Sequence, residues 1–113
     1  MISLIIPTDR LIPQRFAALT VAFVVLVRPQ YRNDAGLIAH ELTHVKQFWR
    51  TLGFNGLLYW LVPSYRQKYE VEAYRAQLES SPESIGVFAI SLATKYRLDL
   101  TPARAIELLK GQP

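Results

Sequence analysis

The sequence contains no cysteine and only two histidines. The absence of cysteine excludes disulfide bonds and thiolate ligands, so any bound metal ion must be held by nitrogen and oxygen atoms. Charged residues are also scarce, at 19% of the 113 residues, whereas apolar residues make up 50%. This balance is typical of a globular chain rather than a disordered one, and the length predicts one domain over residues 1–113.

No apolar run is long enough to cross a membrane. The best candidate is FAALTVAFVVLV at residues 16–27, which is well short of the ~20 residues that a membrane-spanning helix needs. The first residues, MISLIIPTDR, lack the basic start and the small-residue cleavage site of a secretory signal. We therefore expect no membrane span and a cytoplasmic location.

The net charge of +4 comes from lysines and arginines scattered along the chain rather than from a basic run. This distribution indicates a mild bias toward acidic partners and argues against nucleic-acid binding. It does not specify an oligomeric state.

β-Branched residues and prolines predict a small amino-terminal sheet followed by helices. Residues 2–6 and 20–27 read as two strands, with a short helix over PQRFAAL, residues 13–19, between them. Asn33 or Asp34 is a suitable N-cap for a long helix that runs to about Leu52 and stops at Gly53. Further helices are expected over residues 66–79, from 81 to about 96, and from 101 to about 110. The predicted fold class is α+β, with a mostly helical remainder after the sheet.

The long predicted helix carries both histidines, in the stretch HELTH at residues 40–44. Residues four positions apart overlie each other on a helix, so His40 and His44 can reach one ion. The chance of this spacing with a glutamate after the first histidine is on the order of 0.1%. Glu41 falls inside an apolar stripe, where a carboxylate loses its hydration unless a cation or strong donors face it. The stripe consists of Leu37, Val45, Phe48 and Leu52.

A catalytic zinc ion uses three protein ligands and keeps its fourth position for water. Glu41, one residue past the first histidine, is placed to take a proton from that water without binding the metal. The motif therefore predicts one zinc ion per chain, with His40 and His44 as ligands and Glu41 as the general base. The alternative is that the two histidines are ordinary polar residues at the edge of a core face.

The third ligand must be a carboxylate, because no other histidine or cysteine is available. Glu70, Glu72 and Glu79 lie on the next clear helix. Glu72 and Glu79 share a charged face of the kind normally left in water. Glu70 points the other way, beside the small Ala73, so we favour Glu70 over Glu72 as the ligand. The competing interpretation pairs Glu70 with Arg66, four residues earlier.

The block HELTH resembles the active-site helix of the zincin metallopeptidases. In the glutamate-ligand branch of that family, the gluzincins, a later helix carries Glu-x-x-x-Asp, and EVEAY at residues 70–74 fits this spacing with Tyr74 in the place of the aspartate. The broader strings HELTHVKQ and YEVEAYRAQ resemble small stand-alone zincin-like proteins of phage and bacterial origin, over about residues 20–79. The resemblance implies a minimal zincin-like domain that hydrolyses peptide bonds in a peptide or protein substrate.

The chain departs from the family pattern in two ways. The aspartate that orients a ligand histidine is missing, so we expect Gln47, Tyr74 or a backbone carbonyl to take that role. The extra histidine that stabilises the tetrahedral intermediate in larger zincins is also missing. A different donor must then face the developing oxyanion. The candidates are Tyr59, Tyr65, Tyr69, Tyr74 and Arg66.

The apolar stretch GLLYWLV at residues 56–62 has two interpretations. It is either buried core, or a wall or lid that receives a hydrophobic substrate side chain, with Gly53 and Gly56 as hinges. The zincin resemblance also implies that a strand edge holds an extended peptide, and the strand that ends near Arg28 is the candidate.

The function that we favour is a zinc metallopeptidase with His40, His44 and Glu70 as metal ligands and Glu41 as the base. The second hypothesis is a non-catalytic, zinc-stabilised module that binds a protein partner. The third is a helical nucleic-acid binder that uses residues 81–110, although these helices look more like scaffold.

Overall fold

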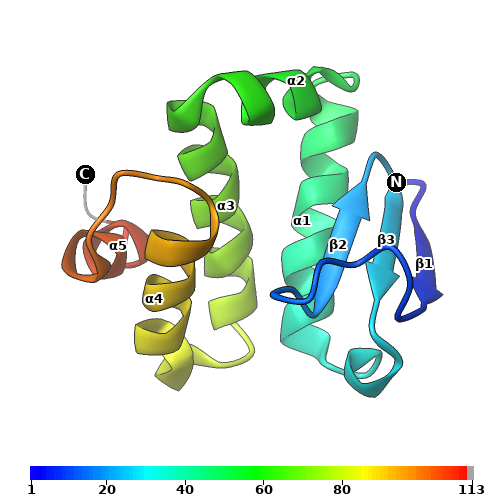
Figure 1. Ribbon diagram of the computed structural model, residues 1–113, viewed down its shortest axis with the longest axis horizontal. Helices are drawn as coiled ribbons and strands as arrows, with labels where there is room; N and C mark the ends of the chain where they lie inside the picture. Colours follow the sequence, from blue (N-terminus) through cyan, green and yellow to red (C-terminus); the bar gives the residue numbers. More distant parts are fainter. Residues whose placement is uncertain (112–113) are drawn as a thin grey trace.

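Three short strands come first along the chain and five helices follow, in a computed structural model that describes residues 1–111. The sheet lies on one side and the helices fill the rest of the molecule (Figure 1). The predicted α+β class is therefore confirmed. Within residues 1–111, no helix combines the length and the apolar character needed to cross a bilayer.

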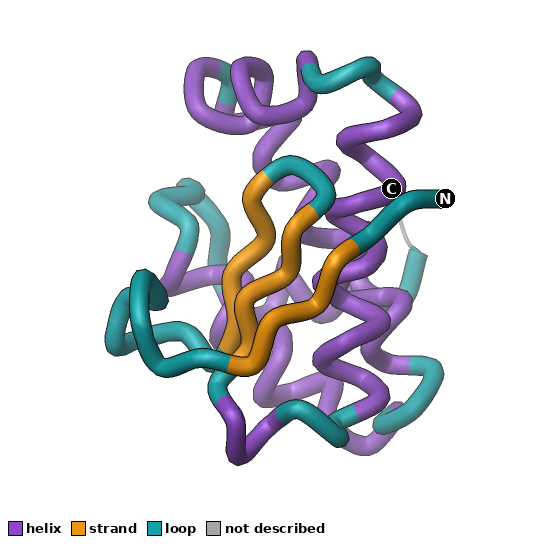
Figure 2. Tube along the Cα trace, turned by 90° about the vertical axis from the view of Figure 1, so that its right-hand side faces the viewer, coloured by secondary structure: helices purple, strands orange, loops and turns teal. Residues whose placement is uncertain are grey.

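The sheet contains β1 (Leu4–Pro7), β2 (Ala18–Val21) and β3 (Val24–Val27), in the order β1-β3-β2. β1 runs parallel to β3, and β2 runs antiparallel to it (Figure 2). Val25 and Val27 of β3 are fully buried, whereas every residue of β1 is exposed. The central strand thus anchors the sheet, and β2 forms one of its edges.

The prediction of a single strand over residues 20–27 is wrong, because this stretch folds back on itself as a hairpin. Val21 pairs with Val24, which leaves Ala22 and Phe23 as a two-residue turn. Ala22 has a φ of 56°, a left-handed conformation that is uncommon outside glycine, asparagine and aspartate. No turn-forming residue marks this position, so the apolar pattern continues through it. The strand that ends near Arg28 is consequently the central strand, and the edge strand is β2.

The short helix predicted over residues 13–19 is also wrong. A single turn closes between Phe16 N and Pro13 O at 3.0 Å, and β2 already begins at Ala18. The side chain of Arg28 donates hydrogen bonds to three carbonyl oxygens of this segment, those of Ile12, Pro13 and Phe16. Because these bonds satisfy carbonyls that a helix would use, the segment stays a loop.

The helices begin and end close to the predicted positions. A short 3-10 turn, η1 (Pro29–Tyr31), precedes α1 (Ala35–Arg50). Asp34 is the N-cap of α1, and its side chain accepts a hydrogen bond from Leu37 N at 3.0 Å. α3 (Pro63–Leu78) starts earlier than predicted, because Pro63 takes the first helical position, where its missing N–H costs nothing. A second 3-10 turn, η2 (Pro82–Ser84), leads into α4 (Ile85–Lys95), and α5 (Pro102–Leu109) completes the described chain.

The stretch GLLYWLV does not form core. It belongs to α2 (Phe54–Leu61), in which no residue is buried. Left-handed Leu52 and Gly53, with φ of 53° and 90°, turn the chain out of α1, and α2 then crosses between the ends of α1 and α3 (Figure 1). Leu52 is 84% exposed, so the apolar stripe predicted for the long helix ends before it.

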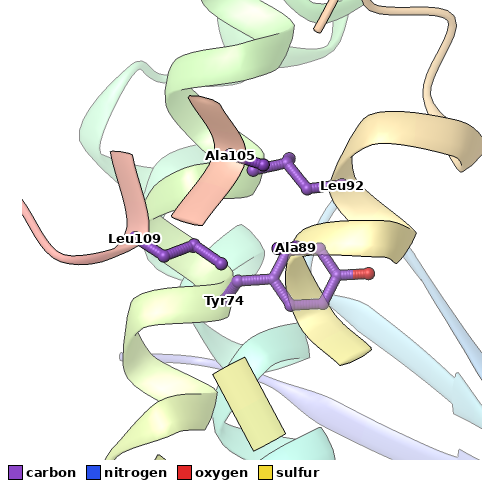
Figure 3. Packing of buried hydrophobic residues seen from close by; sticks show 5 residues of the cluster. All are labelled: Tyr74, Ala89, Leu92, Ala105 and Leu109. Carbon is purple, nitrogen blue, oxygen red and sulfur yellow. The ribbon is translucent and has the colours of Figure 1, made fainter. Parts of the chain in front are cut away.

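The apolar core lies between α3, α4 and α5. Five buried side chains meet there (Figure 3), namely Tyr74, Ala89, Leu92, Ala105 and Leu109. α1 packs along the other side of α3, but the buried residues that it brings to this interface include His40 and Gln47. The interface between α1 and α3 is therefore polar, and the candidate site lies in it.

Candidate metal centre

His40, His44 and Glu70 converge between α1 and α3. Glu70 Oε1 lies 3.3 Å from His40 Nε2 and 3.1 Å from His44 Nε2. One donor atom from each of the three residues lies within 4.8 Å of the other two. Ligands bound at ~2.0–2.1 Å to a tetrahedral ion are separated by roughly 3.3–3.4 Å, which is close to both distances. The structure thus brings together the three residues predicted as metal ligands.

Each histidine is held through Nδ1 by a glutamine side chain. His44 Nδ1 lies 2.9 Å from Gln47 Oε1, and His40 Nδ1 lies 3.0 Å from Gln77 Oε1. An amide oxygen only accepts hydrogen bonds, so each Nδ1 carries a proton and donates it. The remaining ring nitrogen, Nε2, is then free to present its lone pair to a metal ion.

The orientation of the Gln47 amide follows from its other hydrogen bonds. This side chain is fully buried, and its Nε2 donates to Tyr69 O at 3.0 Å and to Glu72 Oε1 at 2.7 Å. Both partners are acceptors, so the NH₂ group must face them and Oε1 must face His44. Glu72 also accepts from Arg50 Nη2 at 2.8 Å. Glu72 therefore lies outside the cluster and supports it through Gln47.

Gln77 is a site residue that the sequence analysis missed. It follows Glu70 by seven positions and so shares its face of α3, a spacing that was available as a signal. Gly36 makes room for it, since a Cβ there would lie 3.3 Å from Gln77 Cγ and 3.4 Å from Gln77 O. Tyr74, which was expected to orient a histidine, instead packs its ring edge-on against His40, with centroids 4.4 Å apart.

The two Nε2 atoms and the carboxylate oxygen of Glu70 all present lone pairs to the same space, so a positive charge must lie between them. Burial alone would lower the pKa of His44, but the charge of Glu70 and its hydrogen bond outweigh burial and raise this pKa to about 10. Burial alone would raise the pKa of Glu70, but attraction to His44 and hydrogen bonds from both histidines hold it below its usual range. A shared proton satisfies this demand in the metal-free protein. A divalent cation satisfies it equally, and two imidazoles with one carboxylate are a donor set that suits zinc.

The second carboxylate oxygen of Glu70 is bonded to α2. Tyr59 Oη donates to Glu70 Oε2 at 2.6 Å. Burial and the negative charge of Glu70 raise the pKa of Tyr59, so its hydroxyl keeps the proton that makes this bond. Oε1 is thereby left for a cation, and α2 is tied to the cluster by one short hydrogen bond.

Glu41 lies beside the cluster but outside it. Its Oε2 is 3.8 Å from His40 Nε2, and its Oε1 accepts a hydrogen bond from Thr20 Oγ1 at 2.8 Å. Glu41 is buried, as predicted for a carboxylate on the inner face of α1. Thr20 belongs to β2, so the sheet edge and α1 meet at this carboxylate. No local pattern pairs a strand threonine with a helix residue 21 positions later, and the sequence analysis did not identify Thr20.

Arg66 is occupied by backbone carbonyls. It is buried and donates to four of them, those of Tyr59 at 2.9 Å, Trp60 at 3.5 Å, Tyr96 at 2.7 Å and Arg97 at 3.3 Å. These bonds hold α2 and the segment after α4 against α3. No ion pair joins Arg66 to Glu70 among residues 1–111, so the predicted alternative of an Arg66–Glu70 pair is not observed.

The tyrosines proposed as oxyanion donors lie in different surroundings. Tyr65 and Tyr69 pack against each other with ring centroids 6.0 Å apart, away from the cluster. Tyr74 Oη is bonded to Tyr96 Oη at 2.8 Å. Tyr59 and Tyr96 line the same cleft as the cluster. Tyr96 was not among the sequence candidates, because it lies on no recognisable motif.

The cluster opens into a cleft of about 620 Å³. β2, α2 and the segment after α4 form its walls. Among residues 1–111, the carboxylates that line it are those of Glu41 and Glu70. Three of the basic residues that line it have no carboxylate within 4.0 Å among residues 1–111: Arg15, Lys95 and Arg97. A larger hollow of about 860 Å³ elsewhere on α3 contains neither Glu41 nor any of the three candidate ligands.

No known family model matches the chain, and no curated protein or solved structure is significantly similar to it.

Proposed function

We propose that the chain is a zinc-dependent metallopeptidase, a minimal zincin-like domain in which His40, His44 and Glu70 hold one zinc ion and Glu41 is the general base. The observation that carries this proposal is the convergence of two Nε2 atoms on one carboxylate oxygen, with both Nδ1 atoms already bonded. Structural zinc sites are closed by four protein ligands, whereas catalytic sites use three and stay open. Three candidate ligands beside a cleft support the catalytic type.

A zinc ion in this position would polarise the carbonyl of a scissile peptide bond and lower the pKa of a water molecule. Glu41 accepts a proton from the attacking water as the water oxygen bonds to the carbonyl carbon. It then returns that proton to the amine nitrogen as the carbon–nitrogen bond breaks. Thr20 holds Oε1 of Glu41, which leaves Oε2, the oxygen nearer His40, to carry the proton.

The edge strand supports a peptide as the substrate. All four residues of β2, Ala18–Val21, line the cleft, and β2 pairs with β3 on one side only. An extended peptide can add to the other side and run past the cluster. The unpaired basic groups of the cleft favour a peptide with acidic side chains.

The decisive variant is Glu41→Gln. The amide keeps the size of the side chain and an oxygen for Thr20, but it cannot accept the proton of water. We expect normal folding and one zinc per chain, with turnover lowered by a factor of ~10² to 10⁴. Zinc content is measured by elemental analysis, and cleavage of a mixed peptide library is followed by mass spectrometry. Glu79→Gln, which changes an exposed glutamate, is the matched control.

The outcomes separate the hypotheses. Cleavage that persists in Glu41→Gln with zinc retained would show that the base is a different group. Zinc bound firmly by both proteins, with cleavage by neither, would instead favour the non-catalytic module that binds a protein partner. In such a module Glu41 is only a buried carboxylate, and its neutral replacement leaves partner binding intact.

A further inference from the structure

The region around α2 presents an uncharged, apolar surface. Residues 51–65 contain no aspartate, glutamate, lysine or arginine. Five apolar side chains in this region are more than half exposed, namely Leu52, Phe54, Leu57, Trp60 and Leu61, and we call them the α2 patch. Single exposed apolar residues are normal on a protein surface, but a contiguous group of large ones marks a site of interaction.

The α2 patch lies on a ridge rather than in a groove. α2 crosses between the ends of α1 and α3 at one extremity of the molecule (Figure 1). Three hydrogen bonds hold it on its inner side, one from Tyr59 to Glu70 and two from Arg66 to the carbonyls of Tyr59 and Trp60. The outward side of the helix is thus free, and its inward side is fixed.

Cations border the α2 patch on the side of the cleft. The guanidinium of Arg97 lies over the ring of Trp60, with Cζ 5.5 Å from the centroid. Arg97 has a φ of 54°, a strained conformation that Arg66 supports by bonding to its carbonyl oxygen. Arg97, Lys95 and Arg15 line the cleft together with Trp60, and none of the three has a carboxylate within 4.0 Å among residues 1–111. The border of the patch is therefore basic.

We propose that the α2 patch docks onto the surface of an anionic lipid bilayer. An uncharged helix with exposed leucine, phenylalanine and tryptophan, bordered by basic groups, has the composition of a segment that lies in the membrane interface. The net charge of +4 adds attraction to acidic lipid headgroups. With 8 residues, α2 is too short to span a bilayer and lies flat in its interface instead.

Docking has a consequence for the cleft. Gly56, Tyr59 and Trp60 of α2 line it, so the inserted helix holds the mouth of the cleft at the lipid surface. Substrates near a membrane would then reach the cluster most readily. The docking itself does not depend on the metal or on catalysis, and it is tested without either.

The test uses the full chain and two kinds of vesicle, pure phosphatidylcholine and a mixture of phosphatidylcholine with phosphatidylglycerol. Binding is measured by co-sedimentation. Trp49→Phe leaves Trp60 as the single tryptophan, so its emission and its quenching by brominated lipid report insertion directly. We expect sedimentation with the anionic vesicles, a blue shift of Trp60 and quenching by the brominated lipid.

Two double variants distinguish vesicle binding through the α2 patch from nonspecific hydrophobic adsorption. Leu57→Ser with Trp60→Ser should weaken binding at least tenfold, because both side chains lie in the α2 patch. Val87→Ser with Ile90→Ser removes comparably exposed side chains from α4 and should leave binding unchanged. Arg97→Gln should weaken binding to anionic vesicles about fivefold and reduce its salt dependence.

Several results would overturn the proposal. These are failure of the chain to sediment with anionic vesicles, equal binding to neutral vesicles, and equal weakening by the α4 variants. A solution dimer that dissociates on Leu57→Ser with Trp60→Ser, without vesicle binding, would assign the α2 patch to a second copy of the chain. If that variant misfolds by circular dichroism, quenching in the Trp49→Phe protein still decides the matter.

Discussion

Gln47→Leu tests whether the hydrogen bond behind the candidate metal centre tunes it. The substitution keeps a side chain of similar volume. It removes the acceptor 2.9 Å from His44 Nδ1, together with the donor to Tyr69 O and Glu72 Oε1. No other side chain is bonded to that nitrogen among residues 1–111. The protonated Nδ1 of His44 is then a partly buried donor without a partner, and the ring is free to rotate or to change tautomer.

The expected loss of zinc affinity follows from the hydrogen bond between His44 Nδ1 and Gln47 Oε1. A buried donor left unsatisfied costs ~1–3 kcal/mol, and this cost falls on the ring orientation that binds metal. A loss of 10 to 100-fold in zinc affinity corresponds to about 1.4–2.8 kcal/mol. The two estimates agree, so we expect Gln47→Leu to weaken zinc binding by one to two orders of magnitude.

Zinc affinity is measured by competition with a chromophoric chelator, at constant pH, after circular dichroism has shown that the variant is folded. Gln67→Leu is the control for the chemical change, because the Gln67 side chain is only partly buried and makes no hydrogen bond among residues 1–111. It should bind zinc like the unaltered chain. A folded Gln47→Leu protein with unchanged zinc affinity would refute the role that the geometry assigns to Gln47.

Two further predictions concern Glu70 and Glu72 on the one hand and Thr20 on the other. Glu70→Ala should abolish stoichiometric zinc binding, whereas Glu72→Ala should bind zinc almost normally, because Glu72 contacts Gln47 and not the cluster. Zinc content is measured by elemental analysis after dialysis, and the reverse outcome would assign the ligand to Glu72. Thr20→Val removes the hydroxyl that donates to Glu41, the proposed general base, at 2.8 Å. It should lower turnover about tenfold, the worth of a hydrogen bond of ~1.4 kcal/mol. Zinc affinity should not change in this variant, and a parallel loss of zinc would point to a structural role for Thr20 instead.

The helical part of the site was predictable from the sequence because its rules are local. A spacing of four residues puts His40 and His44 on one side of a helix, and the apolar neighbours of Glu70 show which way it faces. Caps and prolines mark the helix starts, as at Asp34 and Pro102. These signals act over a few residues, so they need no knowledge of the rest of the fold.

The parts that involve the sheet and α2 were not predictable in the same way. The turn at Ala22 carries no turn-forming residue, and strand pairing joins residues far apart, so neither the edge strand nor Thr20 could be placed. The apolar content of α2 indicates burial, but no element of the described chain covers Leu57 or Trp60. An apolar pattern predicts that a surface is buried, but it does not indicate whether the chain itself or a partner covers that surface.

The interface between α1 and α3 shows how this small domain combines stability with a reactive site. Apolar packing is concentrated between α3, α4 and α5, while the α1 side of α3 is occupied by histidine, glutamine and glutamate side chains. Among residues 1–111, no buried side-chain nitrogen or oxygen lacks a hydrogen-bond partner, so this polar interface is satisfied rather than strained. Its centre nevertheless needs one positive charge between Glu70 and the two histidines. A metal ion bound there, as we propose, would also hold α1 against α3, and metal binding would then be coupled to the packing of the two helices.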